Sequence, residues 1–346
     1  MTTVKKIAEL AEVSIGTVDR VIHKRGRVSK ETREKIEKII NELGYTPNFF
    51  AKSLRRSKVY SFAVLIPQSE QDNNFWKLFH PGIERARKQL EAYNVKISIF
   101  NYDRTSGESF KRESWKMLQS EPDGFILAPV LMPAVEAFVH QIPENIPYVF
   151  IDSPIQNTNC LFHIGHNSYQ SGRLAGQLTN TSIGGKSGTV AVFRSFGRMI
   201  HMADRVNGFR DYMSNRNDIQ LKYYDIKGVE SNKFYADLTE QAISESPDLL
   251  GIYITNAYAH GIARYLQENN LKKELSLVGY DLVDENIKYL KEGYIDFLIS
   301  LRPDLQAYRA LFALYRSLVQ NRVMDDSEVK IPIDILTKEN IDYHSF

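Results

Sequence analysis

The chain has 346 residues, of which 44 are Lys or Arg, 42 are Asp or Glu and one is Cys. This length predicts two or three domains, and a hydrophobic content of 43% is ordinary for a globular protein. No apolar run reaches the ~18 residues of a membrane helix, the first residues lack a signal-peptide pattern, and Cys160 alone cannot form an intramolecular disulfide, so we expect a cytoplasmic protein with no membrane partner.

Charge is unevenly distributed along the chain. Residues 1–58 contain 14 Lys or Arg and 7 Asp or Glu, a net charge of +7, whereas the remainder has a net charge of −5. A small basic head on a mildly acidic body indicates that the head meets a polyanion. The alternative is a solvated basic tail, which the regular pattern of the head disfavours.

Three helical patterns occupy residues 1–45, each with apolar residues three or four positions apart. These are Ile7, Leu10 and Ala11 in the first, Val18, Val21 and Ile22 in the second, and Ile36, Ile39, Ile40 and Leu43 in the third. Ser14 and Ser29 are placed to cap the second and third helices, and Gly44 to end the third. Two helices joined by a tight turn and braced by a third predict a helix-turn-helix.

The second helix has an unusual outward face, made of Gly16, Thr17, Asp19 and Arg20. A helix that lies in the major groove of DNA must approach closely, so small or thin residues suit it. Arg20 can contact guanine or a phosphate, and Ile15 can contact a thymine methyl group. The alternative is a helical bundle that binds a protein.

Residues 46–58 predict a short helix, because Pro47 followed by Asn48 is typical of a helix start. The segment is basic and apolar on one side. It is too short to form a stable helix alone in water. We therefore expect it to need a second surface against which to fold.

From residue 59 onward, short β-rich apolar runs alternate with helical patterns. We expect about nine strands, within 59–67, 95–103, 123–130, 147–153, 188–193, 222–226, 249–256, 275–281 and 296–301. This alternation predicts parallel sheets covered on both faces, arranged as two doubly wound α/β lobes with a cleft between them. The expected N-lobe is about 59–163 plus 301–322, and the C-lobe about 164–300 plus 323–346. Ligands of such sheets bind beyond the carboxyl ends of the strands.

The head resembles that of the lactose-repressor/galactose-repressor (LacI/GalR) family of bacterial regulators through IAELAEVSIGTVDRVIH, VSKETREKI and LGYTPNFFAKSL. The body, residues 59–346, resembles the effector domain of that family and the type I periplasmic sugar-binding proteins. The resemblance implies an all-α helix-turn-helix head, a hinge and a two-lobed α/β effector domain. It also implies a homodimer on a near-palindromic DNA operator. Residues 330–346 contain no heptad repeat, which favours a dimer over a tetramer.

The resemblance assigns DNA contacts residue by residue. The assigned residues are Ser14 and Thr17 at phosphates, Ile15, Gly16 and Arg20 at bases, and Asn48, Leu54 and Arg55 in the hinge. In family members the hinge folds when two subunits meet on DNA, and Leu54 occupies the position of a leucine wedged into the minor groove. Asp19 departs from the family, where most members have a small hydroxyl residue, and we interpret it as paired with a neighbour.

The resemblance also implies an effector site at the strand ends. Its residues are Asn73, Phe75, Trp76, Asp152, Arg205, Asn256 and Asp281. Aromatic rings suit the C–H faces of a sugar, while amides and carboxylates bind its hydroxyls. Ala257 and Leu301 depart from the acidic residue and the glutamine that sugar-binding relatives often have, which leaves the identity of the sugar open.

These features predict a ligand-responsive transcription regulator, a repressor by resemblance, whose effector is a sugar or sugar derivative. One alternative keeps the architecture but has a nucleobase or nucleoside as effector, and another is a sugar-binding receptor or enzyme. No acid/base pair for an enzyme is evident, and we expect no cofactor or metal, because His163 and His166 have no third ligand. Residues 180–188 resemble a phosphate loop, but Asn180 replaces its first glycine and a strand follows.

Overall fold

The computed structural model describes residues 4–22, 26, 28–43, 58–195, 200–226, 231–272, 275–322 and 330–344. The chain divides into two compact units, Met1–Lys58 and Val59–Phe346. Within the described ranges, no helix has both the length and the apolar content needed to cross a membrane. Most of the predicted hinge, residues 46–58, lies outside the described residues, including Asn48, Leu54 and Arg55, and so does Gly44.

The first unit contains the three predicted helices: α1 (Val4–Ala11), α2 (Ile15–Ile22) and α3 (Lys30–Glu42). Their shared core contains Ile7, Ala8, Ala11, Val18, Val21 and Ile36. The Ser14 hydroxyl accepts a hydrogen bond from the Thr17 backbone N–H at 3.1 Å, which caps α2 as expected. Leu10 and Leu43 belong to the apolar patterns of their helices but are 46% and 38% exposed. Ala8 fills the narrow space between the helices, and Leu43 lies beyond the end of α3.

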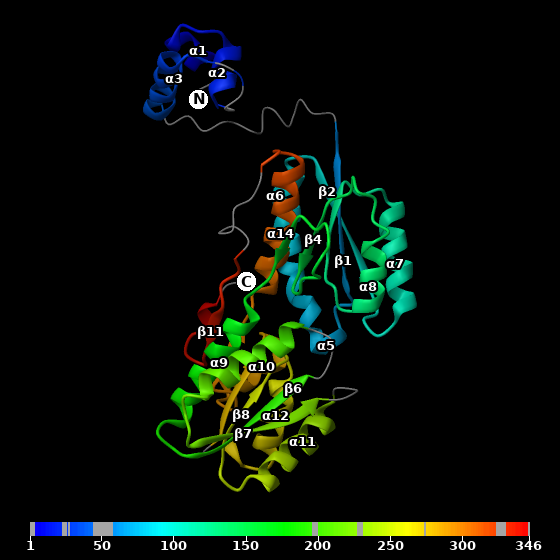
Figure 1. Cartoon of the computed structure of the whole chain (residues 1–346), viewed down its shortest axis with the longest axis vertical. Helices are drawn as coiled ribbons and strands as arrows, with labels where there is room; N and C mark the ends of the chain where they lie inside the picture. The colour runs from blue at the N-terminus through cyan, green and yellow to red at the C-terminus, as the bar shows by residue number, and fades with distance from the viewer. Residues whose placement is uncertain are drawn as a thin grey trace. The chain divides into compact units, whose positions relative to one another are not determined.

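The first lobe of the second unit is a parallel sheet of five strands in the order β2-β1-β3-β4-β5. The strands are β1 (Tyr60–Pro67), β2 (Val95–Tyr102), β3 (Gly124–Leu127), β4 (Tyr148–Ile151) and β5 (Phe162–Ile164). Helices α6 (His80–Glu91) and α14 (Pro303–Leu318) cover one face, and α7 (Gly107–Gln119) and α8 (Met132–Val139) cover the other (Figure 1). Alternation along β1 explains this, because Val64 packs under α6 and α14 whereas Leu65 packs under α7 and α8.

The second lobe is a six-stranded sheet in the order β11-β10-β9-β8-β6-β7, parallel except for the pairing of β10 with β11. The strands are β6 (Gly188–Ser195), β7 (Ile219–Ile226), β8 (Leu249–Ile254), β9 (Ser276–Tyr280), β10 (Phe297–Ser300) and β11 (Asp334–Leu336). Helices α9 (Ser168–Ile183) and α10 (Ile200–Met213) cover one face. The other face is covered by α11 (Asn232–Glu245), α12 (Ala259–Glu268) and α13 (Asp284–Lys291).

The chain passes between the lobes after β5, after β10 and after α14. Helix α14 lies beside α6 in the first lobe although it follows the strands of the second lobe in sequence (Figure 1). Ile331 still packs in the core of the first lobe, whereas Leu336 belongs to the second, so the last crossing comes later than the expected 322. All nine predicted strands are present. The structure adds β5 and β11, which have three residues each and are too short to give a periodic signal.

Candidate functional site

The outward face of α2 presents small and thin side chains to the surroundings of the first unit. Ile15 is 53% exposed, and Gly16, Asp19 and Arg20 are exposed beside it. The Ser14 and Thr17 hydroxyls lie 2.9 Å apart at the start of the helix. This face has one guanidinium, one carboxylate, two hydroxyls and a branched apolar group. Guanidinium and hydroxyl groups can donate hydrogen bonds to DNA phosphates and base edges, and an apolar group can contact a thymine methyl.

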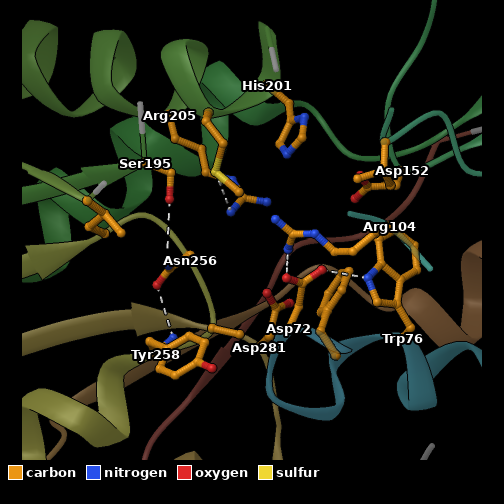
Figure 2. Close-up of a pocket in the computed structure, with 15 residues that line it drawn as sticks. Asp72, Trp76, Arg104, Asp152, Ser195, His201, Arg205, Asn256, Tyr258 and Asp281 are labelled. Carbon is orange, nitrogen blue, oxygen red and sulfur yellow. Dashed lines mark hydrogen bonds and ion pairs between the residues drawn. The ribbon is translucent and has the colours of Figure 1, made fainter. Parts of the chain in front are cut away.

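The second unit has a cavity of about 180 Å³ between its lobes, lined by residues that follow the strands of both sheets (Figure 2). Six of the seven predicted effector residues line it: Phe75, Trp76, Asp152, Arg205, Asn256 and Asp281. Parallel strands end on the same edge of each sheet, so the two sheets bring these residues together from positions up to about two hundred residues apart. Their roles toward an effector stay predictions.

Asn73, the seventh predicted residue, does not line the cavity, and Asp72 lines it instead. Residues 71–74 (α5) and 75–79 (η1) follow β1, and the backbone is left-handed at Asp72, Asn73 and Asn74, with φ of 52°, 57° and 64°. Asn and Asp tolerate this conformation better than other residues with a side chain. The turn directs the Asn73 amide to Nδ1 of His260 in the second lobe, 3.3 Å away.

The wall of the cavity in the first lobe is an ion pair backed by aromatic rings. The Asp72 carboxylate pairs with the guanidinium of Arg104, and its Oδ2 accepts a hydrogen bond from Nε1 of Trp76 at 2.7 Å (Figure 2). Trp76 stacks on Phe79 with ring centroids 5.3 Å apart, and Phe75 meets the Trp76 ring edge-on. Trp76 is therefore both a core residue and part of the cavity wall, with its only polar atom fixed.

Asp152 directly follows β4 and has a left-handed backbone, φ 66°, which turns its side chain toward the cavity. Its backbone N–H donates to Oε1 of Gln306 at 2.9 Å, and the Gln306 amide in turn donates to the carbonyl of Leu301 at 2.9 Å. Gln306 is buried on α14. One side chain thus fixes Asp152 to the segment where the chain crosses between the lobes.

Arg205 lies on α10 and is only 2% exposed. Helices α9 and α10 pack closely because Gly172 has no Cβ, which would lie 2.0 Å from the Arg205 carbonyl oxygen. The guanidinium lies over the Tyr280 ring, 4.3 Å from its centroid, and donates to the carbonyl of Thr255. In the described part of the chain its Nε has no hydrogen-bond partner.

Asp281 directly follows β9, has a φ of 67° and is buried, with 3% of its surface exposed. Among the described residues, its Oδ1 has no hydrogen-bond partner. Burial raises the pKa of the Asp281 carboxyl to about 7, and the nearby Asp152 charge adds to this, while the Arg205 charge opposes it. A buried carboxylate oxygen without a donor is costly, so this group is prepared to accept a hydrogen bond from a ligand.

Asn256 lines the cavity, but protein atoms already use its amide. Nδ2 donates to the Tyr235 hydroxyl at 2.9 Å. Nδ2 also lies 3.4 Å from the Ser195 hydroxyl, and Oδ1 accepts from the Tyr258 N–H at 3.1 Å (Figure 2). Tyr258 stacks on Tyr235 with centroids 4.9 Å apart. Asn256 therefore contacts both Ser195 and Tyr258 at the cavity wall, and its role toward an effector stays a prediction.

Three histidines lie at or near the cavity: His201 lines it, and His163 and His166 are in contact with residues that line it through hydrogen bonds to protein atoms. Nε2 of His163 lies 3.3 Å from the Asp152 carbonyl, Nε2 of His166 lies 2.9 Å from the Ser168 hydroxyl, and Nδ1 of His201 lies 2.6 Å from the Ser153 hydroxyl. Burial lowers the pKa of all three imidazoles, that of His201 to about 4. They are therefore neutral at neutral pH.

Sequence reasoning missed several residues that line the cavity: Asp72, Arg104, Val130, Ser195, His201, Met202, Ile226 and Tyr258. Most of them lie at or just after the end of a strand, so the rule used to find Asp152 and Asp281 predicts their region but not their orientation. His201 and Met202 belong to the first turn of α10, where that rule does not apply. Residues 180–188, which resemble a phosphate loop, form the connection between α9 and β6. The Arg216 guanidinium donates hydrogen bonds to the backbone carbonyls of Gly184 and Lys186 in this connection.

Two family models match the chain. Residues 3–48 match the model of bacterial regulatory proteins of the lacI family, and residues 62–321 match that of the periplasmic binding protein domain. The first match covers α1 to α3, and the second covers most of both lobes. Both agree with the division into two units.

Known proteins resemble the chain over most of its length. The ribose operon repressor of Lactococcus lactis is 23% identical over 99% of this chain and 98% of the relative. A structure from Bacteroides fragilis, described as a LacI transcriptional regulator, superimposes with a TM-score of 0.72 at 29% identity, over 83% of this chain and 100% of that chain. A solute-binding protein of Burkholderia graminis in complex with D-arabinose shares the fold, with a TM-score of 0.73 at 19% identity over 84% and 100% of the chains.

Proposed function

The chain belongs to the lacI family of bacterial regulatory proteins, with a periplasmic-binding-protein domain as its body, and from this premise we propose that it is a sugar-responsive repressor. One observation supports this most strongly. Hydrogen-bonding side chains from both lobes converge on one cavity in a chain whose other unit is a helix-turn-helix. Sensing and DNA binding are thus assigned to separate units of one chain.

The chemistry of the cavity supports a sugar as effector. A sugar ring has hydroxyls around its edge and C–H groups on its faces, so it needs carboxylates and guanidinium groups beside aromatic rings. The carboxylates are those of Asp152 and Asp281, and the guanidinium group is that of Arg205. The aromatic rings come from opposite lobes, Phe75 from the first and Tyr258 from the second. The ribose operon repressor of Lactococcus lactis and the arabinose-bound protein of Burkholderia graminis support the same ligand class by resemblance.

Effector binding is proposed to act through lobe closure. A sugar that contacts both lobes binds most tightly when they are closed, so it shifts the equilibrium toward closure by its difference in affinity for the two states. We propose that the protein is a homodimer on a near-palindromic operator, so that closure changes the spacing of two heads. The proposed DNA contacts in each head are Ser14, Ile15, Gly16, Thr17 and Arg20. The proposed location is the cytoplasm, because a bacterial regulator must reach the DNA there.

A thermal-stability screen tests the effector class directly. The purified protein is heated with neutral sugars, sugar phosphates, nucleobases and nucleosides, and a true effector at 100 times its Kd adds roughly 2.7 kcal/mol to stability. The expected result is stabilisation by a sugar, lost in Asp152→Ala. Stabilisation by a nucleobase or nucleoside alone would replace the sugar assignment with the nucleoside alternative.

A further inference from the structure

The ionisable side chains that line the cavity set its net charge, and this charge affects whether a neutral or an anionic ligand binds there. Among the described residues that line it, the ionisable groups other than histidine and tyrosine are two guanidinium groups and three carboxyls: Arg104, Arg205, Asp72, Asp152 and Asp281. His201 adds no positive charge at neutral pH, because burial lowers its pKa to about 4. The cavity therefore has a net charge of −1 with Asp281 ionised and zero with it protonated, and in neither state is it positive.

Arg104 is the group on which this balance depends in the first lobe. Its guanidinium faces the cavity and, left alone, would attract an anion. The carboxylate of Asp72 pairs with it directly, and the two side chains are only 31% and 21% exposed (Figure 2). Because the pair is partly shielded from solvent, Asp72 cancels the positive charge locally instead of leaving it to be screened by salt.

Neighbouring residues hold this pair in place without help from a ligand. Oε1 of Gln71 accepts a hydrogen bond from the Arg104 backbone N–H at 2.9 Å, and Nε2 of Gln71 donates to Oδ1 of Asp103 at 2.7 Å. Trp76 fixes the second oxygen of Asp72. The turn after β1 and the end of β2 are therefore joined by both backbone and side-chain contacts, and the pair is positioned in advance.

The second lobe disfavours an anion for a different reason. Asp281 is buried, and its Oδ1 has no donor within the described residues. A sugar hydroxyl can donate to this oxygen. A carboxylate group, or a phosphate group in its dianionic form, has no proton to donate to this oxygen. Beside ionised Asp281 it also brings a second negative charge into a site of low dielectric constant, which is repulsive.

The size of the cavity restricts the effector as well. Its volume is about 180 Å³, and a cavity of about 150 Å³ holds one benzene molecule. One six-membered ring with small substituents is comparable to this space.

Resting on the proposed sugar-sensing function, we propose that the cleft takes an uncharged single-ring sugar and that Asp72, by neutralising Arg104, is the residue that excludes phosphorylated and carboxylated sugars. Asp72 is thus a specificity-determining residue, distinct from groups that only add affinity. Asp72→Asn removes the negative charge but keeps the shape of the side chain, so the charge of the Arg104 guanidinium is no longer neutralised. An anionic sugar can then bind to this guanidinium more favourably than in the wild-type protein.

Isothermal titration calorimetry with matched sugar pairs tests this proposal. The pairs are D-ribose with D-ribose 5-phosphate, D-glucose with D-glucose 6-phosphate and D-glucuronate, and D-galactose with D-galacturonate. Wild-type protein is expected to bind at least one neutral sugar, and to bind its anionic counterpart about tenfold more weakly or worse. The ratio of the affinity for the neutral sugar to that for its anionic counterpart is expected to fall by about tenfold in Asp72→Asn. In Arg104→Gln the same affinity ratio should stay unchanged or increase.

Asp284→Asn is the matched control, because it removes the same charge from the same chain outside the cavity. The Asp284 side chain is 88% exposed and pairs only loosely with Lys77, at 3.9 Å, so the ratio should stay at the wild-type value. Tighter wild-type binding of an anionic sugar than of its neutral partner overturns the proposal. So does an unchanged ratio in a folded Asp72→Asn, or a narrowed ratio in Arg104→Gln. Binding of no sugar at all instead contradicts the proposed function.

Discussion

The hydroxyl of Ser153 lies 2.6 Å from Nδ1 of His201, and this hydrogen bond joins the two lobes beside the cavity. Ser153 follows β4 in the first lobe, and His201 is in the first turn of α10 in the second. The pKa of His201 is lowered to about 4, mainly by burial; the Asp152 charge opposes this effect, and Arg205 and His163 add to it. The contact is therefore made by a neutral imidazole.

His201→Gln is expected to change how stability depends on pH. The pKa of His201 is about 4 in the folded chain against an ordinary 6.5, so the unfolded chain binds more protons between these values. The contribution of the neutral ring is complete above pH 6.5 and is lost as the pH falls toward 4. Urea unfolding should show the wild type losing stability relative to His201→Gln over this window. His140→Gln, at an exposed histidine, serves as control. If the difference in unfolding free energy between the wild type and His201→Gln is the same at pH 7 and pH 4.5, the lowered pKa of His201 is contradicted.

Asp281→Asn is expected to show the opposite pH dependence without effector. The pKa of Asp281 is raised from 3.8 to about 7 by burial, so the folded chain binds more protons between these values and the wild type loses stability as the pH rises through this range. An amide does not titrate, so the stability of the variant relative to the wild type should increase from pH 4 to pH 8. Denaturant unfolding at four pH values measures this, and a constant difference refutes the raised pKa.

Gln306→Leu is expected to weaken both folding and effector binding, although Gln306 is not among the residues that line the cavity. The change leaves the Asp152 N–H and the Leu301 carbonyl without their buried partner, at a cost of about 1–3 kcal/mol. Asp152 then loses its fixed orientation. Gln306→Glu keeps the acceptor for Asp152 and should retain more sugar affinity than Gln306→Leu in calorimetry. Equal affinities for the two variants would remove the positioning role.

Gly16→Ala separates DNA binding from stability in the head. A Cβ at Gly16 would lie 3.7 Å from the Ser14 hydroxyl oxygen, an ordinary contact, so the fold accepts it. Alanine is favoured over glycine in a helix by about 0.5–1 kcal/mol, so the head should be no less stable. The added methyl group points out from the proposed DNA-contacting face and should weaken specific binding in an anisotropy titration. Wild-type affinity in this variant would mean that α2 does not approach DNA at Gly16.

The sequence predicted the architecture and part of the cavity for an identifiable physical reason. Parallel strands end on one edge of a sheet, so the residues directly after them, such as Asp152 and Asp281, could be assigned from strand positions and the resemblance alone. The sequence could not show that Asp72 lines the cavity in place of the predicted Asn73. This depends on left-handed backbone angles that an Asp-Asn-Asn segment tolerates but does not require.

The ion pair of Asp72 and Arg104 was equally hidden in the sequence. Its partners follow neighbouring strands, and only the three-dimensional register of β1 and β2 brings them together. His201 was missed because it enters the cavity from a helix and not from a strand end. What local patterns cannot predict is the orientation of side chains after a turn and the pairing of charges across elements.

Coupling between the cleft and the DNA-binding head is tested most directly by one titration. A labelled duplex, selected from a random library by the wild-type protein, is titrated with wild type and Asp152→Ala, with and without a saturating amount of the sugar identified in the stability screen. Fluorescence anisotropy should show that the sugar changes the wild-type Kd for DNA by about tenfold, within the usual range of allosteric coupling. Asp152→Ala should bind DNA with the wild-type Kd and should not respond to the sugar at that concentration. A wild-type Kd that stays the same at saturating sugar would contradict a regulator that senses sugar in this cleft.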